Sequence, residues 1–268
     1  MFDEVIACLD GSSLAETILP LARGLTVTCG GRLTLLRVVA DAAELAAEEN
    51  YLRDCACQYS GQLRFLVAAD PAGAIAAELE RNPNAIAALT THGRTAWAES
   101  ILGSVALQVI RAAKRPVLLF CPLGRDAPKK ISKIVLALDG SEFAERMISY
   151  AAKATQSLRA QLLLVQALPV GAAAPALKNH EKSDISESSY LHWQAASIKK
   201  KYAITAQWEV LHGEPATAIC DYLKGMAETL LMLTTHARGA VERAMLGSVA
   251  ADCIRHAGVP LLLYWPPH

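Results

Sequence analysis

The chain repeats itself, and this internal repeat constrains the fold more than any other feature of the sequence. VIACLDGS at 5–12 resembles IVLALDGS at 134–141, which lies 129 residues further along. Near the end of each copy LGSVA at 102–106 recurs at 246–250, now 144 residues apart. A long sequence that recurs at a nearly fixed spacing predicts two copies of one structural unit.

The change in spacing means that the second copy carries 15 extra residues. They fall in or near 169–184, a segment with the composition of a loop. Residues 121–130 are rich in proline and charge, as expected of a linker. We therefore predict two domains, 1–123 and 131–268.

Each copy alternates apolar runs of strand length with segments of helical pattern, which favours parallel strands covered by helices. The apolar runs at 4–9 and 85–91 predict strands buried on both faces. At 205–210 polar and apolar residues alternate, as in the half-exposed edge strand of a sheet. In the first copy we expect strands at 4–9, 32–39, 63–69, 85–91 and 116–120, and helices at 13–28, 42–60, 72–81 and 104–114.

This pattern predicts an α/β chain of two tandem Rossmann-like domains, each a five-stranded parallel sheet of flavodoxin-like order 3-2-1-4-5. The last strand of each copy, at 116–120 and 260–265, is strongly apolar and would lie at a sheet edge. Exposed apolar edges favour aggregation, so proteins usually pair or cover them. We expect the two edges to pair as an intramolecular pseudo-dimer. Two units on a flexible linker are the alternative, and homodimerisation of the whole chain is left open.

Composition excludes several classes of function. The net charge is +0, which gives no general attraction to nucleic acid or to an anionic membrane. No apolar run approaches the roughly 18 residues that span a bilayer. Acidic residues stand at 3 and 4, where a signal peptide needs positive charge, so we expect a cytoplasmic protein. Among seven cysteines the only close pair is Cys55 and Cys57, which does not predict a metal site because no histidine is near it.

Polar and glycine-rich segments follow the first and fourth predicted strands, where ligands bind in such sheets. Asp10 ends the first strand, Thr91–Arg94 end the fourth, and Gly103 and Ser104 open the next helix. A helix start of this kind offers free backbone N–H groups to an anion. Each feature also has an ordinary structural interpretation: Asp10 as a turn residue, Gly103–Ser104 as a cap, and Arg94 as a solvated surface residue.

Taken together, the Asp-Gly-Ser segments, the turns at Asp70-Pro and Glu214-Pro, and the block from the fourth strand onward resemble the universal stress protein family. In the ATP-binding branch of that family the block is Gly-x2-Gly-x9-Gly-Ser/Thr. The first copy has Thr90-x2-Gly93-x9-Gly103-Ser104 and the second has Thr234-x2-Ala237-x9-Gly247-Ser248. The resemblance covers both halves and implies a tandem member of the family.

The resemblance also implies a ligand, ATP or another adenine nucleotide, with or without Mg²⁺, and a protein partner that the sequence does not name. Asp10 and the main chain at Val38 would contact adenine, Gly93 would approach the ribose and phosphates, and Gly103, Ser104 and Val105 would hold phosphates. A Cβ at Ala237 costs about 1 kcal/mol if that position needs positive φ, so we expect the first copy to bind more tightly. The implied ligand residues are Asp10, Val38, Thr90, Gly93, Arg94, Gly103, Ser104 and Val105, and more weakly Asp139, Ala167, Gly247, Ser248 and Val249.

Three functions stay open at this point: a nucleotide-binding regulator of the stress response, a slow ATPase, and a protein with vestigial sites that acts through its surfaces. The chain has no Gly-x4-Gly-Lys-Ser/Thr loop, no Gly-x-Gly-x-x-Gly and no Gly-x-Ser-x-Gly. No lysine lies in either Gly-Ser loop to neutralise charge on a γ-phosphate. We therefore predict no catalytic residue, no metal ligand and at most slow ATP hydrolysis.

Overall fold

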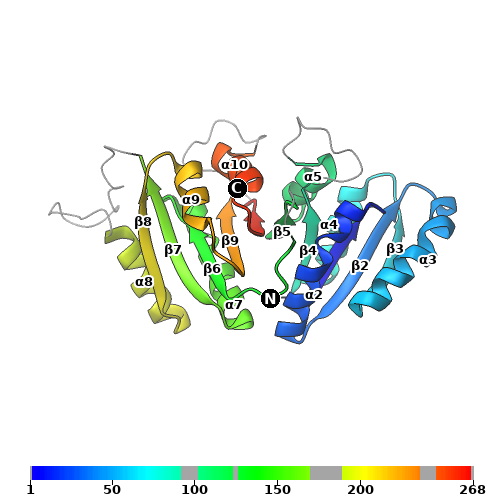
Figure 1. The fold of residues 1–268 in the computed structure, drawn as a ribbon, viewed down its shortest axis with the longest axis horizontal. Helices are drawn as coiled ribbons and strands as arrows, with labels where there is room; N and C mark the ends of the chain where they lie inside the picture. The colour runs from blue at the N-terminus through cyan, green and yellow to red at the C-terminus, as the bar shows by residue number, and fades with distance from the viewer. Residues whose placement is uncertain (1, 92–101, 123–125, 170–188, 236–245, 267–268) are drawn as a thin grey trace.

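The computed structural model describes residues 2–91, 102–122, 126–169, 189–235 and 246–266. Helices and strands alternate through both copies (Figure 1). The strands are β1 (Glu4–Leu9), β2 (Arg32–Val39), β3 (Gln62–Val67), β4 (Ala85–Thr90), β5 (Val117–Phe120), β6 (Lys133–Ala137), β7 (Gln161–Leu168), β8 (Ala206–His212), β9 (Thr229–Thr234) and β10 (Leu261–Tyr264). The helices are α1 (Ser13–Glu16), α2 (Leu19–Cys29), α3 (Ala42–Tyr59), α4 (Pro71–Arg81), α5 (Ser104–Ala112), α6 (Glu142–Glu145), α7 (Ile148–Leu158), α8 (Ser189–Tyr202), α9 (Pro215–Leu223) and α10 (Ser248–His256).

The strands form one ten-stranded sheet in the order β3-β2-β1-β4-β5-β10-β9-β6-β7-β8. Within each half the order is 3-2-1-4-5 and every pair is parallel, as the sequence predicts. The halves meet where β5 and β10 pair antiparallel, with Leu118 opposite Leu262. The pairing of the two apolar edge strands is thus confirmed. The domain limits 1–123 and 131–268 stay a prediction.

Two layers of helices cover the sheet. Helices α2, α3, α7 and α8 bury one face, and α4, α5, α9 and α10 bury the other (Figure 1). Each face carries a core of Leu, Ile, Val and Ala side chains that runs through both halves. Burial of one such large aliphatic side chain stabilises the fold by about 1.5–3 kcal/mol. No helix within the described ranges is long and apolar enough to cross a membrane.

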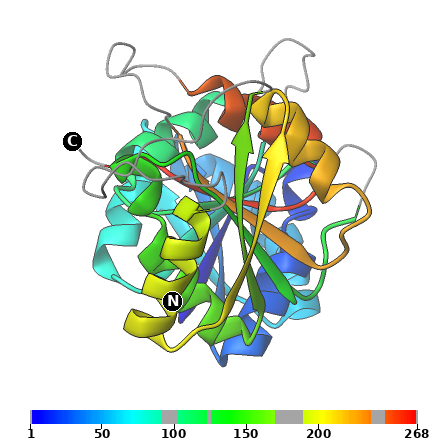
Figure 2. The ribbon, with the colours of Figure 1, turned by 90° about the vertical axis from the view of Figure 1, so that its left-hand side faces the viewer.

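The sheet twists strongly, so the strands of the near half cross in front of those of the far half (Figure 2). As a result α5 and α10 both lie at the top of Figure 1, whereas α2 and α7 approach each other below the sheet. The thiol of Cys29 on α2 contacts the main-chain oxygen of Ser157 on α7 at 3.5 Å. The carboxyl ends of the strands of both halves therefore face the same side of the molecule.

Two expectations need correction. Segment 13–28 is not one helix, because the chain breaks between α1 and α2. The break recurs between α6 and α7, where Ser149 stands in place of Pro20, so proline is not its only cause. In both halves the residue at the break, Ile18 or Met147, is fully buried. Strand β8 is an edge strand as expected, but Trp208, expected on its buried face, is 37% exposed.

Candidate functional site

A cavity of about 290 Å³ opens at the carboxyl edge of the sheet in the first half. Strands β1, β2 and β4 contribute its floor, and the first turn of α5 closes one side. This is the place between β1 and β4 where the strand order reverses, which is where open α/β sheets bind ligands. The lining residues are Cys8, Leu9, Asp10, Ala15, Leu36, Arg37, Val38, Pro71, Ile75, Leu89, Thr90, Thr91, Gly103, Ser104, Val105 and Ala106.

The turn after β1 is built by Asp10. Its Oδ1 accepts hydrogen bonds from the Ser12 amide at 3.0 Å and the Ser12 hydroxyl at 2.6 Å. The Ser12 oxygen in turn caps α1 by accepting from Ala15 N at 3.1 Å. Gly11 between them has φ 82°, a conformation that disfavours any side chain. The turn interpretation of Asp10 therefore holds, and the same residue lies at the cavity wall.

The start of α5 presents backbone N–H groups to the cavity. Gly103 is the N-cap residue, and no side chain caps the helix. The Gly103 amide donates to Thr91 O at 2.6 Å, which ties the helix start to the end of β4. Ser104 and Val105 follow in the first turn and line the cavity. An uncapped helix start at a cavity wall carries partial positive charge and favours an anion.

Gly103 is not required by its backbone conformation, since its φ of −56° and ψ of 146° suit any residue. A Cβ built there would meet only Thr91 O, at 3.4 Å. The fold would therefore accept alanine at this position. The missing side chain leaves open space at the cavity wall, where a ligand could approach the backbone closely.

Sequence reasoning missed Arg37, which is 8% exposed and lines the same cavity. Its Nη1 donates to Val38 O at 3.1 Å. The guanidinium therefore already forms a hydrogen bond with the main-chain oxygen of Val38, the residue that the family resemblance places in contact with adenine. The signal was visible, because Arg37 is the only charged residue between Leu33 and Val39 of a buried strand. A charge is retained in such a strand only when it has partners or a ligand.

The other lining groups are not set up for catalysis. Burial raises the pKa of the Cys8 thiol to about 12, so it is protonated and a poor nucleophile at neutral pH. Thr90 and Thr91 are buried at the end of β4. In the part of the chain that the structure describes, no three His, Cys, Asp or Glu residues come together as metal ligands.

Six of the eight first-half residues expected at the ligand line this one cavity. Gly93 and Arg94 lie outside the described residues. In the second half Asp139 follows β6, Ala167 lies in β7, and Gly247, Ser248 and Val249 form the cap and first turn of α10. All five second-half residues therefore lie at or near the carboxyl edge of their own strands. The first-half residues brought together are Asp10, Val38, Thr90, Gly103, Ser104 and Val105.

The second half copies the backbone of this site but not its charge. Asp139 Oδ1 accepts from Ser141 N at 2.9 Å and from Ser141 Oγ at 2.6 Å, as Asp10 does from Ser12. Gly247 caps α10 with φ −60° and no side-chain cap. However, the position of Arg37 is taken by Gln166, which is 1% exposed and whose amide has no hydrogen-bond partner among the described residues. The two halves thus share a cradle and differ in a buried cation.

Comparison with protein-family models shows which family the chain belongs to. The model described as "Universal stress protein family" matches residues 130–264, half of the chain. The chain belongs to the universal stress protein family. Its second copy carries the match directly, and the repeat extends the relationship to the first copy.

Curated relatives agree with this assignment. A universal stress protein of Mycobacterium tuberculosis is 30% identical over 148 residues, which cover 48% of this chain and 46% of the relative. A universal stress protein of Thermus aquaticus is 29% identical over 133 residues, covering 48% of this chain and 96% of the relative. The chain therefore spans about half the length of the mycobacterial relatives that it matches.

Solved structures share the fold over the whole chain. A universal stress protein from Archaeoglobus fulgidus superposes with a TM-score of 0.73 at 18% identity, covering 99% of both chains. The cytoplasmic domain of a prokaryotic cation chloride cotransporter superposes with a TM-score of 0.55 at 14% identity, covering 98% of this chain and 95% of that one. The same fold therefore occurs in very different proteins. For this reason the function has to be argued from the site and not from the fold.

Proposed function

We propose that this chain is a stress-response regulator that binds ATP or another adenine nucleotide, mainly through the first-half cavity. The observation that carries the proposal is the meeting of an uncapped helix N-terminus with a buried arginine in one cavity at the switch point of the sheet. A nucleotide triphosphate is the kind of ligand that such a site suits, since it joins a planar base to several negative charges.

The cavity divides into a part for the base and a part for the phosphates. Asp10 and Val38 line the part that the family resemblance assigns to adenine. The backbone N–H groups of Ser104 and Val105, in the first turn of α5, would donate hydrogen bonds to phosphate oxygens. Arg37 donates to Val38 O, so its guanidinium lies beside the part assigned to adenine and adds positive potential to the cavity as a whole. The described residues bring no set of metal ligands together, so they do not form a protein site for Mg²⁺.

The first half is favoured over the second because a buried cation faces the cavity only in the first half, among the described residues. Arg37 of β2 corresponds to Gln166 of β7, and an amide cannot compensate the charge of a phosphate. The sequence argument from Gly93 and Ala237 points the same way, although both residues lie outside the described ones.

The groups that line the cavity favour binding over rapid catalysis. Asp10 is engaged by Ser12, burial holds the pKa of Cys8 high, and no lysine is among the described lining residues. A bound nucleotide would instead change the surface around α5 that a protein partner contacts. Regulation through nucleotide occupancy follows from this, with slow hydrolysis as the most that the site supports.

Gly103→Ala and its matched control Gly247→Ala test this function. Both glycines have φ near −60° and cap equivalent helices, so both variants should fold. We expect Gly103→Ala to weaken ATP binding at least tenfold in isothermal titration calorimetry, because a methyl group enters the cavity. Gly247→Ala should leave the stronger binding unchanged, and Arg37→Gln should weaken it by a similar factor.

Two results would contradict the proposal. Loss of ATP binding in Gly247→Ala alone would place the main site in the second half. No heat of binding at millimolar ATP, together with no nucleotide in the protein as purified, would remove the nucleotide altogether.

A further inference from the structure

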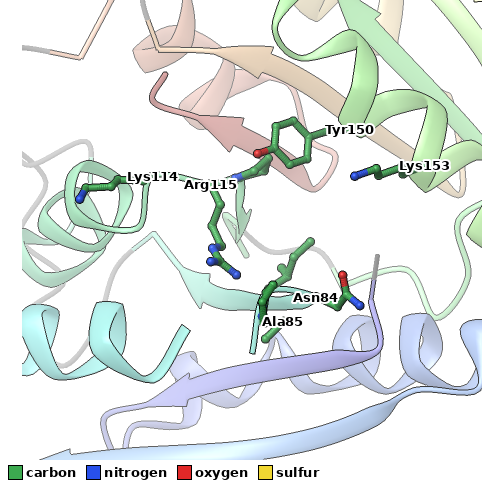
Figure 3. Close-up of a pocket in the computed structure, with 9 residues that line it drawn as sticks. Asn84, Ala85, Lys114, Arg115, Tyr150 and Lys153 are labelled. Atoms are coloured by element: carbon green, nitrogen blue, oxygen red, sulfur yellow. The ribbon is translucent and has the colours of Figure 1, made fainter. Parts of the chain in front are cut away.

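A second cavity, of about 160 Å³, lies at the amino ends of β4 and β5, where α7 of the other half packs against them (Figure 3). Its polar lining consists of Asn84, Lys114, Arg115, Tyr150 and Lys153, which we call the basic groove. In Figure 3 Tyr150 and Lys153 of α7 direct their polar ends toward the side of the groove that Arg115 occupies. Lys114 lies at the rim and points outward.

The positive charges of the basic groove are not neutralised by acidic side chains. Lys114, Arg115 and Lys153 form no ion pair with any described carboxylate. Arg115 donates one hydrogen bond, from Nη1 to Asn82 O at 3.0 Å. The carboxylate tied to the groove is that of Asp3, which accepts from Asn84 Nδ2 at 2.8 Å. Arg115 and Lys153 therefore line one cavity, with Lys114 at its rim and the carboxylate of Asp3 held by Asn84.

The fold alone does not produce this arrangement, because the equivalent groove of the other half is built differently. The repeat aligns Lys114, Arg115 and Lys153 with Gly258, Val259 and Gly24. No cation remains at any of the three positions. Gly24 instead packs against the linker, since a Cβ there would overlap Lys129 O. Linker residues Asp126, Pro128, Lys129 and Lys130 line the cavity beside Gly258 and Val259. The linker thus lines the equivalent cavity, of about 320 Å³, and brings Lys129 and Lys130 to it, whereas the basic groove takes its cations from the two halves themselves.

Tyrosines also distinguish the basic groove. Tyr150 packs edge-to-face on Tyr264 of β10, with ring centroids 5.1 Å apart. Burial, and the neighbouring Tyr150, raise the pKa of the Tyr264 phenol to about 12, so it stays a neutral hydrogen-bonding group. The repeat places Leu21 and Phe120 at these two positions in the other half. Two phenols beside the basic groove therefore replace two apolar side chains of the other half.

Backbone strain marks the same place. Lys114 adopts φ 50° in the turn before β5, and Gly258 adopts φ 68° in the equivalent turn before β10. The turn requires a left-handed residue in both halves, which glycine provides without strain. The first half keeps a lysine there despite a cost of about 1 kcal/mol.

We propose that the basic groove binds a small phosphate-bearing molecule. A phosphate accepts several hydrogen bonds at once, and the Arg115 fork, the Lys153 ammonium and the Tyr150 hydroxyl supply donors of three kinds around one space. The ligand contacts the turn before β5 of one half and α7 of the other, so its binding ties the two halves together. The groove lies at the amino ends of the strands and is separate from the nucleotide cavity at their carboxyl ends.

The test uses pyrophosphate as probe and the whole chain. We expect calorimetry to show one pyrophosphate per chain and a raised melting temperature, because a ligand of the folded state stabilises it. The double variant Arg115→Gln/Lys153→Gln should lose at least tenfold in affinity and the melting shift. The charge-matched control is Lys199→Gln/Lys200→Gln on α8, which removes two exposed lysines outside the groove and should bind as the parent does.

The same titrations separate this proposal from the nucleotide site. Gly103→Ala should keep pyrophosphate binding in the groove even where it weakens ATP. Sugar phosphate in place of pyrophosphate should bind if the natural ligand is a phosphorylated metabolite, and inorganic phosphate should compete for the same site. Unchanged pyrophosphate affinity in the double variant would overturn the proposal. So would equal affinity for citrate, which carries carboxylates and no phosphate, or no binding to the parent at millimolar concentration.

Discussion

The two halves place nearly the same backbone around different side chains, and the differences gather at a few positions. Gly11 and Gly140 both have φ 82°, and the caps of α5 and α10 agree within a few degrees. Those shared features belong to the fold. Arg37 against Gln166 is a difference that the backbone does not demand, whereas Lys153 corresponds to a Gly24 that the linker backbone requires. In a tandem chain each half is therefore a control for the other, and a departure from symmetry points to what one half does alone.

The largest expected effect comes from a side chain at Gly24, which tests whether the linker packs on α2 in the first half only. Alanine in a helix is normally about 1 kcal/mol more favourable than glycine. Here the new Cβ would overlap the backbone of Lys129, so the linker has to move. We expect Gly24→Ala to lower the free energy of unfolding by about 3 kcal/mol and to speed proteolysis between residues 121 and 130.

Lys153→Ala is the matched control on the other half, where no linker crosses the helix. Because Lys153 is exposed and unpaired among the described residues, its loss should change stability by no more than about 0.5 kcal/mol. Urea unfolding followed by circular dichroism measures both variants. Equal stability of the two would show that the linker does not rest on α2.

A second prediction concerns a buried carboxylate that only the first half has. Glu4 accepts from Arg32 at 2.9 Å, Thr34 at 2.5 Å and Asn82 at 2.9 Å, while the second half has the exposed Lys133 at this position. Burial alone would raise the pKa of Glu4, but these hydrogen bonds outweigh it and hold the pKa at about 2. The folded carboxyl group thus binds its proton more weakly than the unfolded one.

Stability from Glu4 is therefore fully present above its unfolded pKa of 4.5 and is lost as pH falls from there toward 2. Glu4→Gln should lower the free energy of unfolding by about 2 kcal/mol at pH 7 and by much less at pH 2.5. Lys133→Gln should show no such pH dependence. An acid titration of the melting temperature compares them. A constant difference between Glu4→Gln and the parent across pH 7 to 2.5 would contradict the assignment.

Much of the fold could be predicted because repetition and apolar runs act locally. The strand order, the parallel pairs within each half and the seam between β5 and β10 followed from strands at 4–9, 85–91 and 116–120. The break after α1 could not be predicted, because Ile18 is buried by tertiary packing rather than by a local signal.

The candidate site was predictable in part. Glycine and serine at a helix start led to the cavity, because helix N-termini have a recognisable sequence pattern. Arg37 was missed because attention went to the polar residues that follow the first and fourth predicted strands, whereas Arg37 lies within the second. The basic groove was missed because its residues come from the turns before β4 and β5 and from α7. The comparison of the two grooves also depends on the course of the linker, which lines the cavity beside Gly258 and Val259. Sequence offers no local signal for that.

The smallest expected effect sharpens the comparison at the turn before β5. Lys114→Gly copies Gly258 and relieves a left-handed conformation, φ 50°, that lysine adopts at a cost. Glycine also loses more conformational freedom on folding, which offsets part of the gain. We expect a net stabilisation of roughly 0.5 kcal/mol in thermal unfolding and, since Lys114 stands at the rim, a two- to fourfold weaker affinity for pyrophosphate. The opposite swap, Gly258→Lys, should destabilise, because it forces a lysine into the left-handed conformation, φ 68°, that glycine adopts without strain. Gain of stability with unchanged affinity would confine the groove to Arg115 and Lys153, and loss of stability would mean that Lys114 makes a contact that outweighs its strain.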